Sequence, residues 1–245
     1  MRAFLFLIIS LLMPVGATAI DYPAIERKAA RFYADREWAS ALAMYELMLS
    51  ERPDVTATYG NAIVAAAVTR QPSTEVALME QAMRHRVPLD SLFSSVETRS
   101  FALGRADIYE GFLLLVKERQ PWMTRNINAR LLDYYTFRRE PDKMIEMARL
   151  MLDGLPDSIQ FLSLLARGQM MSGDTDESLA TYRHILQLDP DNYDALLELG
   201  NHALLQYEAD PSDTASRDSA ITYLSRANAL RPTPYVTAAL TRLAP

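Results

Sequence analysis

Prolines recur along this 245-residue chain at a spacing that few folds produce. Six of them, each after an apolar run, are separated by 35, 33, 35, 34 and 42 residues: Pro53, Pro88, Pro121, Pro156, Pro190 and Pro232. Because proline cannot continue a helix and disfavours helical geometry in the residue before it, each proline marks the end of a helical segment. An interval of about 34 residues holds two helices of ordinary length with their turns. The spacing therefore predicts a chain of repeated helix pairs.

Composition and local pattern also favour helices. Glycine is scarce, with eight residues, and alternating runs of β-branched residues are absent. The i, i+3, i+4, i+7 spacing of an amphipathic helix fits Leu196, Leu199, Gly200 and Ala203. We therefore predict an all-α fold without a sheet.

The repeat is clearest in residues 159–192. Its marked positions are, in order, Leu162, Leu165, Ala166, Gly173, Ser178, Leu179, Tyr182 and Pro190. This pattern resembles the tetratricopeptide repeat (TPR), which has a period of 34 residues. The resemblance implies that the small residues Ala166 and Ser178 lie where helix A and helix B approach closely, with Gly173 in the turn between them. It also implies an all-α, right-handed superhelical solenoid of TPR helix hairpins.

The same frame divides the rest of the chain into similar units. They are residues 22–55, 56–88, 89–122, 125–158, 159–192 and 193–234, with a capping helix at 235–243. The match is weaker in the second and third units, and the sequence leaves residues 89–104 open between helix and loop. We expect the C-terminal cap because a solenoid must cover its last apolar face. Residues 20–245 are thus predicted to be one TPR-like solenoid domain.

The last unit fits the frame only with an insertion of about eight residues. The insertion lies within residues 206–217, which are rich in Asp, Ser, Thr and Pro and predict a solvated loop. Acidic side chains in and beside it, such as Asp210 and Asp213, leave contact with a basic partner or a cation as an alternative. A change at Glu208 is expected to alter the free energy of unfolding by less than about 0.5 kcal/mol.

Charge and motifs exclude several classes of function. The formal net charge is −6, with a mildly basic middle segment, so the concentrated basic surface of a nucleic-acid-binding protein is absent. The three histidines, His85, His184 and His202, have no metal-ligand spacing, and there is no cysteine. Nucleophile and phosphate-binding motifs are absent too. We expect no catalytic residue, no metal and no cofactor, and we interpret Asp189-Pro190-Asp191-Asn192 as an inter-repeat turn rather than a calcium loop.

The TPR resemblance also implies a binding groove. In that family the second, fifth, ninth and twelfth residues of helix A line the concave face. In the last three units, the predicted groove residues are Asn126, Asp133, Thr136, Gln160, Ser163, Arg167, Met170, Asp194, Leu197, Asn201 and Leu204. Ala129, Ser163 and Leu197 stand where carboxylate-clamping TPR domains carry a basic residue, so no clamp of that kind is expected. The groove predicts a non-catalytic adaptor or scaffold for a protein or peptide, with Arg167 as its basic contact.

Two other functions remain open from the sequence. The first is a homo-oligomeric component of the cell envelope, joined through exposed aromatic residues such as Trp122, Tyr134 and Tyr135. The second is a glycan-binding or small-molecule-binding protein, or an enzyme, that uses the groove. An enzyme would place two or more titratable groups facing each other in one pocket.

The N-terminus has the pattern of a signal peptide. Arg2 precedes an apolar run of about eleven residues, shorter than the roughly 20 that span a bilayer, and Ala17-Thr18-Ala19 is a small-x-small cleavage site. The sequence thus predicts export of residues 20–245 across the inner membrane, to the periplasm, without a permanent membrane anchor. N-terminal sequencing of the native protein should return Ile20 as the first residue. Recovery of Met1 would show that the segment is retained.

Overall fold

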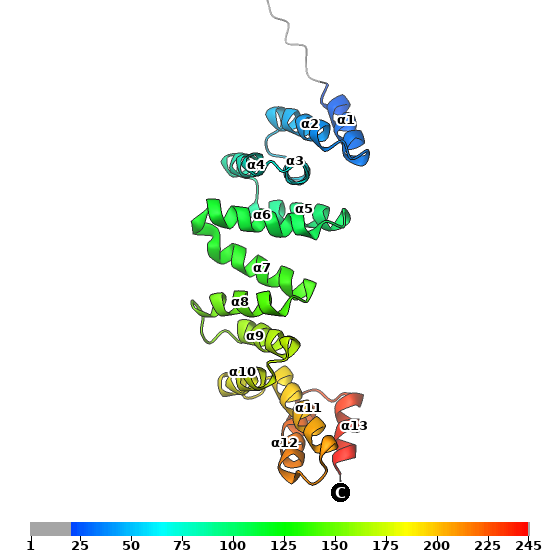
Figure 1. The fold of residues 1–245 in the computed structure, drawn as a ribbon, viewed down its shortest axis with the longest axis vertical. Coiled ribbons are helices and arrows are strands. Elements are labelled where there is room, and N and C mark those ends of the chain that lie inside the picture. Colours follow the sequence, from blue (N-terminus) through cyan, green and yellow to red (C-terminus); the bar gives the residue numbers. More distant parts are fainter. Residues whose placement is uncertain (1–20, 245) are drawn as a thin grey trace, which may run out of the picture. The chain divides into compact units, whose positions relative to one another are not determined.

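The computed structural model describes residues 21–244, which form helices joined by short turns (Figure 1). The predicted signal peptide, residues 1–19, and the predicted mature start at Ile20 lie outside the described residues. Within residues 21–244 there is no β-strand. The chain divides into two units, Met1–Tyr109 and Glu110–Pro245, with the boundary inside α6, Ala106–Arg119.

The first unit consists of antiparallel helix pairs in chain order. Its helices are α1 (Tyr22–Ala34), α2 (Trp38–Glu51), α3 (Thr56–Val68), α4 (Pro72–Arg84), α5 (Leu89–Ala102) and the start of α6. The segment 89–104, left open by the sequence, is helical up to Ala102. Leu92, Phe93 and Val96 from one face of α5 are fully buried, so this helix contributes to the core despite its weak repeat signature.

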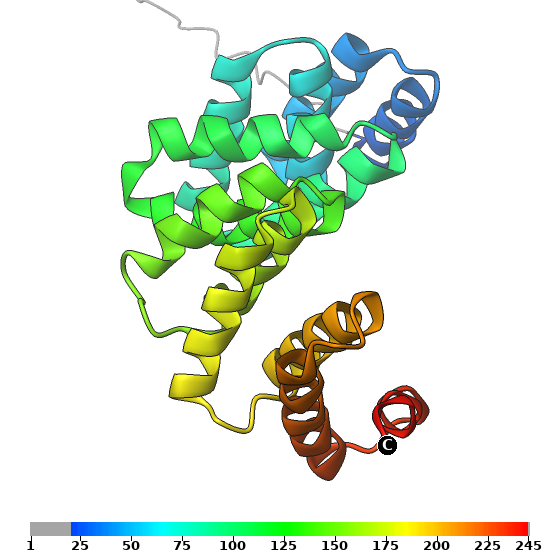
Figure 2. The ribbon, with the colours of Figure 1, turned by 60° about the horizontal axis from the view of Figure 1, so that its bottom comes forward.

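The second unit continues the pairing. After α6 come η1 (Pro121–Met123), α7 (Thr124–Arg138), α8 (Pro141–Leu152), α9 (Ile159–Ser172), α10 (Thr175–Leu188), α11 (Tyr193–Ala209), α12 (Thr214–Leu230) and α13 (Pro234–Leu243). Figure 2 shows α11 and α12 as a long pair with α13 beside them. The prediction of an all-helical array of hairpins is confirmed.

In two hairpins the paired helices approach closely at a small residue. In the α9–α10 pair the buried Ser178 hydroxyl donates a hydrogen bond to the Ala166 carbonyl oxygen at 2.8 Å. In the α11–α12 pair a Cβ built on Gly200 would lie 2.7 Å from Leu224 Cγ. Since a larger side chain at such a point would force the helices apart, these residues set how closely the pairs pack.

The turns between paired helices use left-handed backbone. Gly173 has φ 93°, as predicted for the turn of the best-matched repeat. The corresponding residues of three other hairpins are arginines, with φ of 60° at Arg36, 58° at Arg70 and 55° at Arg139. Left-handed backbone costs a non-glycine residue roughly 1–2 kcal/mol, and the sequence pattern did not indicate that arginine fills it.

The predicted loop over residues 206–217 is wrong. Helix α11 extends to Ala209 and α12 begins at Thr214, so only four residues separate them. The inserted residues lengthen both helices, because Gln206, Glu208 and Ala209 are good helix formers and Asp213 caps α12 by accepting from the Ser216 amide at 3.0 Å. Glu208 lies in α11 and accepts a hydrogen bond from Arg242 of α13 at 2.7 Å.

The last helix covers the end of the second unit. Val236, Ala239 and Leu243 of α13 are buried in one cluster with Leu204 and Leu224. The Arg217 guanidinium of α12 donates to the Leu243 carbonyl oxygen at 2.6 and 3.1 Å. Apolar burial and these charge-assisted bonds together fix α13 as a cap.

One acidic side chain is buried in the first unit. Glu75, in the first turn of α4, is only 6% exposed and occupies the repeat position that Ala41 fills in α2. Burial raises the pKa of its carboxyl to about 7. Between about pH 4.5 and pH 7, the Glu75 carboxyl is therefore protonated in the folded chain and ionised in the unfolded chain.

The close contact at Gly200 can be tested against a glycine without one. Gly200→Ala should lower the free energy of unfolding by about 1–3 kcal/mol, because the new methyl group overlaps Leu224. Gly111 lies in α6 with nothing within 4 Å of a built Cβ, so Gly111→Ala should raise it by about 0.5–1 kcal/mol. Chemical denaturation measures both. Shifts of the same sign would contradict the packing described here.

Glu75 should make stability fall as pH rises. Between about pH 4.5 and pH 7 the native state binds one proton more than the unfolded state, so the free energy of unfolding decreases with pH across this window. The full effect is roughly 3–4 kcal/mol. In Glu75→Met this titration is absent. The free energy of unfolding of the variant, relative to that of the wild type, should therefore rise by that amount from about pH 4 to about pH 8. Parallel stability profiles in urea titrations would contradict the assignment.

Candidate functional site

The predicted groove residues lie on α7, α9 and α11 of the second unit, in environments of three kinds. The exposed ones are Asn126, Asp133, Gln160, Arg167 and Asp194. The half-buried ones are Thr136, Ser163, Met170, Leu197 and Asn201. Leu204 is buried.

Three of these residues line one hollow of about 300 Å³. They are Thr136, Arg167 and Met170, and the remaining walls are Arg139, Met171, Tyr182 and Glu198. The lining comes from α7, the turn after it, α9, α10 and α11. The hollow therefore draws on consecutive hairpins, as a TPR groove does.

Arg167 is the free cation of this hollow. The described residues give its guanidinium neither a hydrogen bond nor an ion pair, although Glu198 and Tyr182 lie near enough to feel its charge. Arg139 also lines the hollow, from left-handed backbone at the end of α7. Two guanidinium groups facing one carboxylate leave the hollow with a positive charge and unused donors.

The pKa values of the acidic and phenolic groups of the hollow are both raised. Burial raises the pKa of the Glu198 carboxyl, Asp194 adds to the effect, and Arg167 opposes it. Burial likewise raises the pKa of Tyr182 to about 12, with a further contribution from Glu198. The Tyr182 hydroxyl therefore stays protonated at neutral pH and offers a hydrogen-bond donor rather than a base.

The remaining polar groove residues outside α11 face other partners. Asn126 accepts a hydrogen bond from Arg130 at 3.1 Å within α7. Burial raises the pKa of Asp133, while Arg130 lowers it. Neither these two residues nor Gln160 and Ser163 line the hollow that contains Arg167.

The prediction that Leu204 is an accessible groove contact is wrong. Its side chain is 3% exposed and packs with Leu224 and Leu243 under α13. Leu197 packs against the same cluster, and Asn201 accepts a hydrogen bond from the Tyr235 hydroxyl of α13 at 2.9 Å. The cap thus occupies the part of α11 that would line the groove if another hairpin followed.

Sequence reasoning missed four residues of the hollow. Tyr182 was recognised only as a packing residue, and Met171 and Glu198 each lie one residue beyond a predicted groove position, Met170 and Leu197. Arg139 had a signal, since it stands where Gly173 stands in the next unit. Its contribution depends on how the turn folds, which the motif does not specify.

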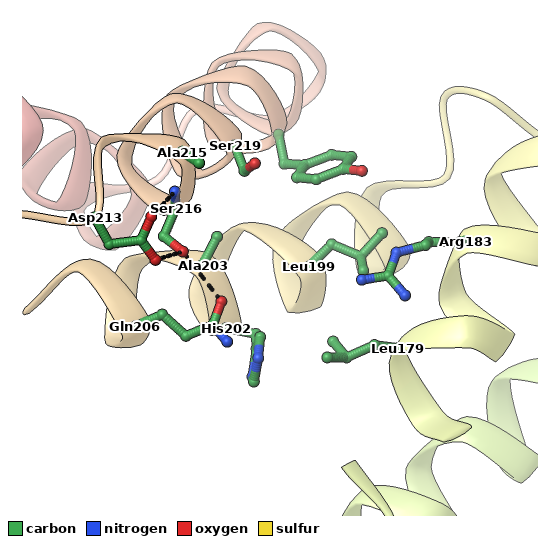
Figure 3. A pocket seen from close by; sticks show the side chains of 11 residues that line it. Leu179, Arg183, Leu199, His202, Ala203, Gln206, Asp213, Ala215, Ser216 and Ser219 are labelled. Atoms are coloured by element: carbon green, nitrogen blue, oxygen red, sulfur yellow. Dashed lines mark hydrogen bonds between the residues drawn. The ribbon is translucent and has the colours of Figure 1, made fainter. Parts of the chain in front are cut away.

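A second hollow, of about 330 Å³, lies between α10, α11 and α12 (Figure 3). It contains Ser216, Asp213 and His202, the residue types of a hydrolase. The Ser216 hydroxyl donates to Asp213 at 2.5 Å, and Asp213 also accepts the Ser216 amide as the cap of α12. In Figure 3 the hydrogen bonds join Asp213, Ser216 and Gln206 and leave His202 apart, so the three side chains do not form the serine–histidine–aspartate relay of a hydrolase.

A third hollow contains one of the aromatic residues through which the sequence suggested contact between copies of the chain. Trp122 is 66% exposed and lines it, but Tyr134 and Tyr135 are only 4% exposed. The interpretation of these tyrosines as exposed is wrong, because both rings face the core and stack edge to face, with centroids 5.4 Å apart. Asn128 in the same hollow has a buried Oδ1 without a hydrogen-bond partner.

Residues 21–244 contain no cluster of three or more side chains suited to a metal ion. In the turn considered as a calcium loop, Asn192 caps α11 by accepting from the Ala195 amide at 3.1 Å and donates to Asp189 at 3.2 Å. The side-chain oxygens of Asn192 and Asp189 thus accept hydrogen bonds within the turn and at the start of α11. Among the described helices, none combines the length and the hydropathy needed to cross a bilayer.

The fold and the site together define the class of protein. The described chain is an all-helical repeat protein with TPR-type hairpins. The TPR resemblance seen in the sequence is confirmed by the repeating helix pairs and their small-residue contacts.

Comparisons with known proteins give similarity of structure only. No protein-family model matches the chain, and no curated protein matches it. A solved protein binding protein from Bacteroides ovatus is 18% identical, with 77% of this chain and 96% of that chain covered and a TM-score of 0.49. A tetratricopeptide repeat protein from Parabacteroides merdae is 12% identical, with coverage of 93% and 85% and a TM-score of 0.44. Pseudomonas aeruginosa pilF is 12% identical, with coverage of 91% and 97% and a TM-score of 0.46.

Proposed function

We propose that this protein is a non-catalytic scaffold that holds a segment of another protein in the hollow around Arg167. The observation that carries the proposal is the unpaired Arg167 guanidinium in a hollow built from consecutive hairpins. A cation held without a partner on a rigid repeat surface gains most from an acidic group supplied by a ligand.

The other walls suit a polypeptide segment. Met170 and Met171 supply flexible apolar surface that adapts to different side chains. The Tyr182 hydroxyl and the Thr136 side chain add hydrogen-bonding groups, although Thr136 already donates to the Leu132 carbonyl at 2.7 Å. A segment carrying one carboxylate beside an apolar side chain would match this arrangement of charge and apolar surface.

The hollow supports binding better than catalysis. The raised pKa values of Tyr182 and Glu198 favour their neutral forms, and neither has a hydrogen-bonded partner that would activate it. The proposal needs no cofactor and no nucleic acid.

The proposed location is the periplasm, outside the inner membrane. It is supported by the signal-peptide pattern of residues 1–19 and by the absence of cysteine, which frees the chain from any dependence on disulfide chemistry. In this setting the scaffold would act without a permanent membrane anchor.

A homo-oligomer remains a second candidate because of one observation. Trp122 is exposed beside the hollow that contains the unsatisfied Asn128 oxygen, and exposed tryptophan is typical of contact surfaces. Mass photometry of the mature protein, with Trp122→Ala alongside, distinguishes a self-associating protein from a monomeric scaffold.

The groove proposal predicts a selective loss of binding. After a partner is captured from the cell envelope and identified by mass spectrometry, Arg167→Ala should weaken its binding by at least about 1 kcal/mol. The melting temperature should stay nearly unchanged, because Arg167 is exposed and unpaired. Arg183→Ala, which removes an exposed arginine from the hollow of Figure 3, is the matched control and should bind normally. Equal binding by wild type and Arg167→Ala would reject this hollow as the site.

A further inference from the structure

Arginine occupies strained backbone at equivalent turns of the first unit. Arg36 lies in the α1–α2 turn and Arg70 in the α3–α4 turn, with φ of 60° and 58°. In the α5–α6 turn Gly104 takes this conformation, with φ 68°, and Arg105 follows it directly. Each turn between paired helices in this unit thus carries an arginine, although glycine would adopt the same backbone at lower cost.

These turns meet at a small hollow of about 190 Å³. Arg36 and Trp38 come from the first turn, Val68 from the end of α3, and Leu103 and Arg105 from the third turn. The hollow therefore has an apolar part, Trp38, Val68 and Leu103, and two arginines in its lining, Arg36 and Arg105. Arg70 lies two residues after Val68, in the same turn, and is exposed.

The charges around this hollow are unevenly neutralised. Arg105 is held by Asp107, which accepts from Nε at 2.9 Å and from Nη2 at 2.8 Å. The described residues provide no hydrogen bond or ion pair for the side chains of Arg36 and Arg70, although Glu37 follows Arg36 in sequence. Asp35, the other neighbour of Arg36, is already bonded to Arg31 at 3.4 Å. Arg36 thus lines the hollow as a free cation, and Arg70 is a second free cation in the turn that follows Val68.

The size and walls of the hollow restrict the ligand. It is smaller than the roughly 300–1,000 Å³ of typical small-molecule sites, so it suits a single side chain that projects from a larger molecule. Trp38 is half-buried and packs edge to face against Tyr33, with ring centroids 5.0 Å apart. Its indole is therefore part of the wall and does not offer the open face on which nucleic-acid bases stack.

We propose that this hollow, lined by Arg36 and Arg105 and adjoined by Arg70 in the turn after Val68, binds a partner polypeptide through one aliphatic side chain flanked by carboxylates. The aliphatic group enters between Trp38, Val68 and Leu103, and the flanking carboxylates pair with the free guanidinium groups. Arg105 keeps unused donors beyond the two that Asp107 engages, so it can bind a carboxylate without moving. The strained turns thereby present cations at fixed points beside the apolar part.

A labelled peptide with one leucine between runs of glutamate is the direct probe. Fluorescence anisotropy with the full-length protein should show binding that weakens at high salt, because the arginine contacts are exposed ion pairs. The double variant Arg36→Gly, Arg70→Gly should bind about fivefold to tenfold more weakly. Its melting temperature should be unchanged or higher, because glycine adopts the left-handed backbone more easily than arginine.

Arg86→Gly is the matched control. Arg86 is also an exposed arginine in left-handed backbone, with φ 58°, but it lies in the turn between α4 and α5, and no residue of that turn lines the hollow. Its substitution removes the same charge and the same strain, and it should leave peptide binding unchanged. An equal loss in Arg86→Gly would show a response to overall charge and would overturn the proposal.

Further outcomes separate this site from other ligands and from the Arg167 hollow. No binding of the glutamate peptide, or equal binding of a glutamine version, overturns the proposal. An anionic lipid vesicle or a short oligonucleotide could bind more tightly than the peptide, with that binding lost in the same double variant. This result would assign the arginines to another ligand and would also overturn the proposal. Arg167→Ala should leave peptide binding intact, so failure of the scaffold proposal and failure of this site are distinguishable.

Discussion

The close approach of paired helices is the constraint on which the rest of the structure depends. A hydrogen bond from Ser178 to the Ala166 carbonyl and the contact of Gly200 with Leu224 bring the two helices of a hairpin nearly into backbone contact. At that separation the large residues around the contact are buried, and the turns must be tight. Tight turns in turn require left-handed backbone at one residue, which is how Gly173 and Arg139 come to occupy equivalent places. The binding surfaces follow from this geometry, since both proposed sites include residues at or beside such turns.

The regular parts of the fold could be predicted because they depend on short-range rules. Proline spacing and small residues at fixed places are sufficient to indicate helix pairs, and Gly173 has the predicted backbone. Prediction failed where composition and packing disagree. Residues 206–217 have the polar composition of a loop, yet Gln206, Glu208 and Ala209 extend α11, because the neighbouring helix and Arg242 offer them contacts. The α5 segment lacks the motif but is held as a helix by Leu92, Phe93 and Val96.

The candidate site was predictable only in part for a similar reason. Arg167 and Met170 follow from the register of one helix, and the structure places both in one hollow. Glu198 and Tyr182 come from other helices, so their approach to Arg167 depends on how hairpins stack and has no signature in any single repeat. Leu204 shows the opposite case, because its register is that of a groove residue but α13 covers it. A repeat motif describes an interior unit and carries no information about which neighbour ends the array.

Covering the terminal face has a consequence for assembly. Without α13, the apolar surface formed by Leu204, Leu224 and Ala220 would be exposed to solvent. It is the same kind of surface with which an interior hairpin packs against the next one. Such a surface is a template for addition of another hairpin, from a second copy or from an unrelated repeat protein. The Arg217 bonds to Leu243 and the Arg242 bond to Glu208 hold the cap in place. The ten-residue helix α13 thus covers the apolar surface on which a further hairpin, from this or another molecule, would otherwise pack.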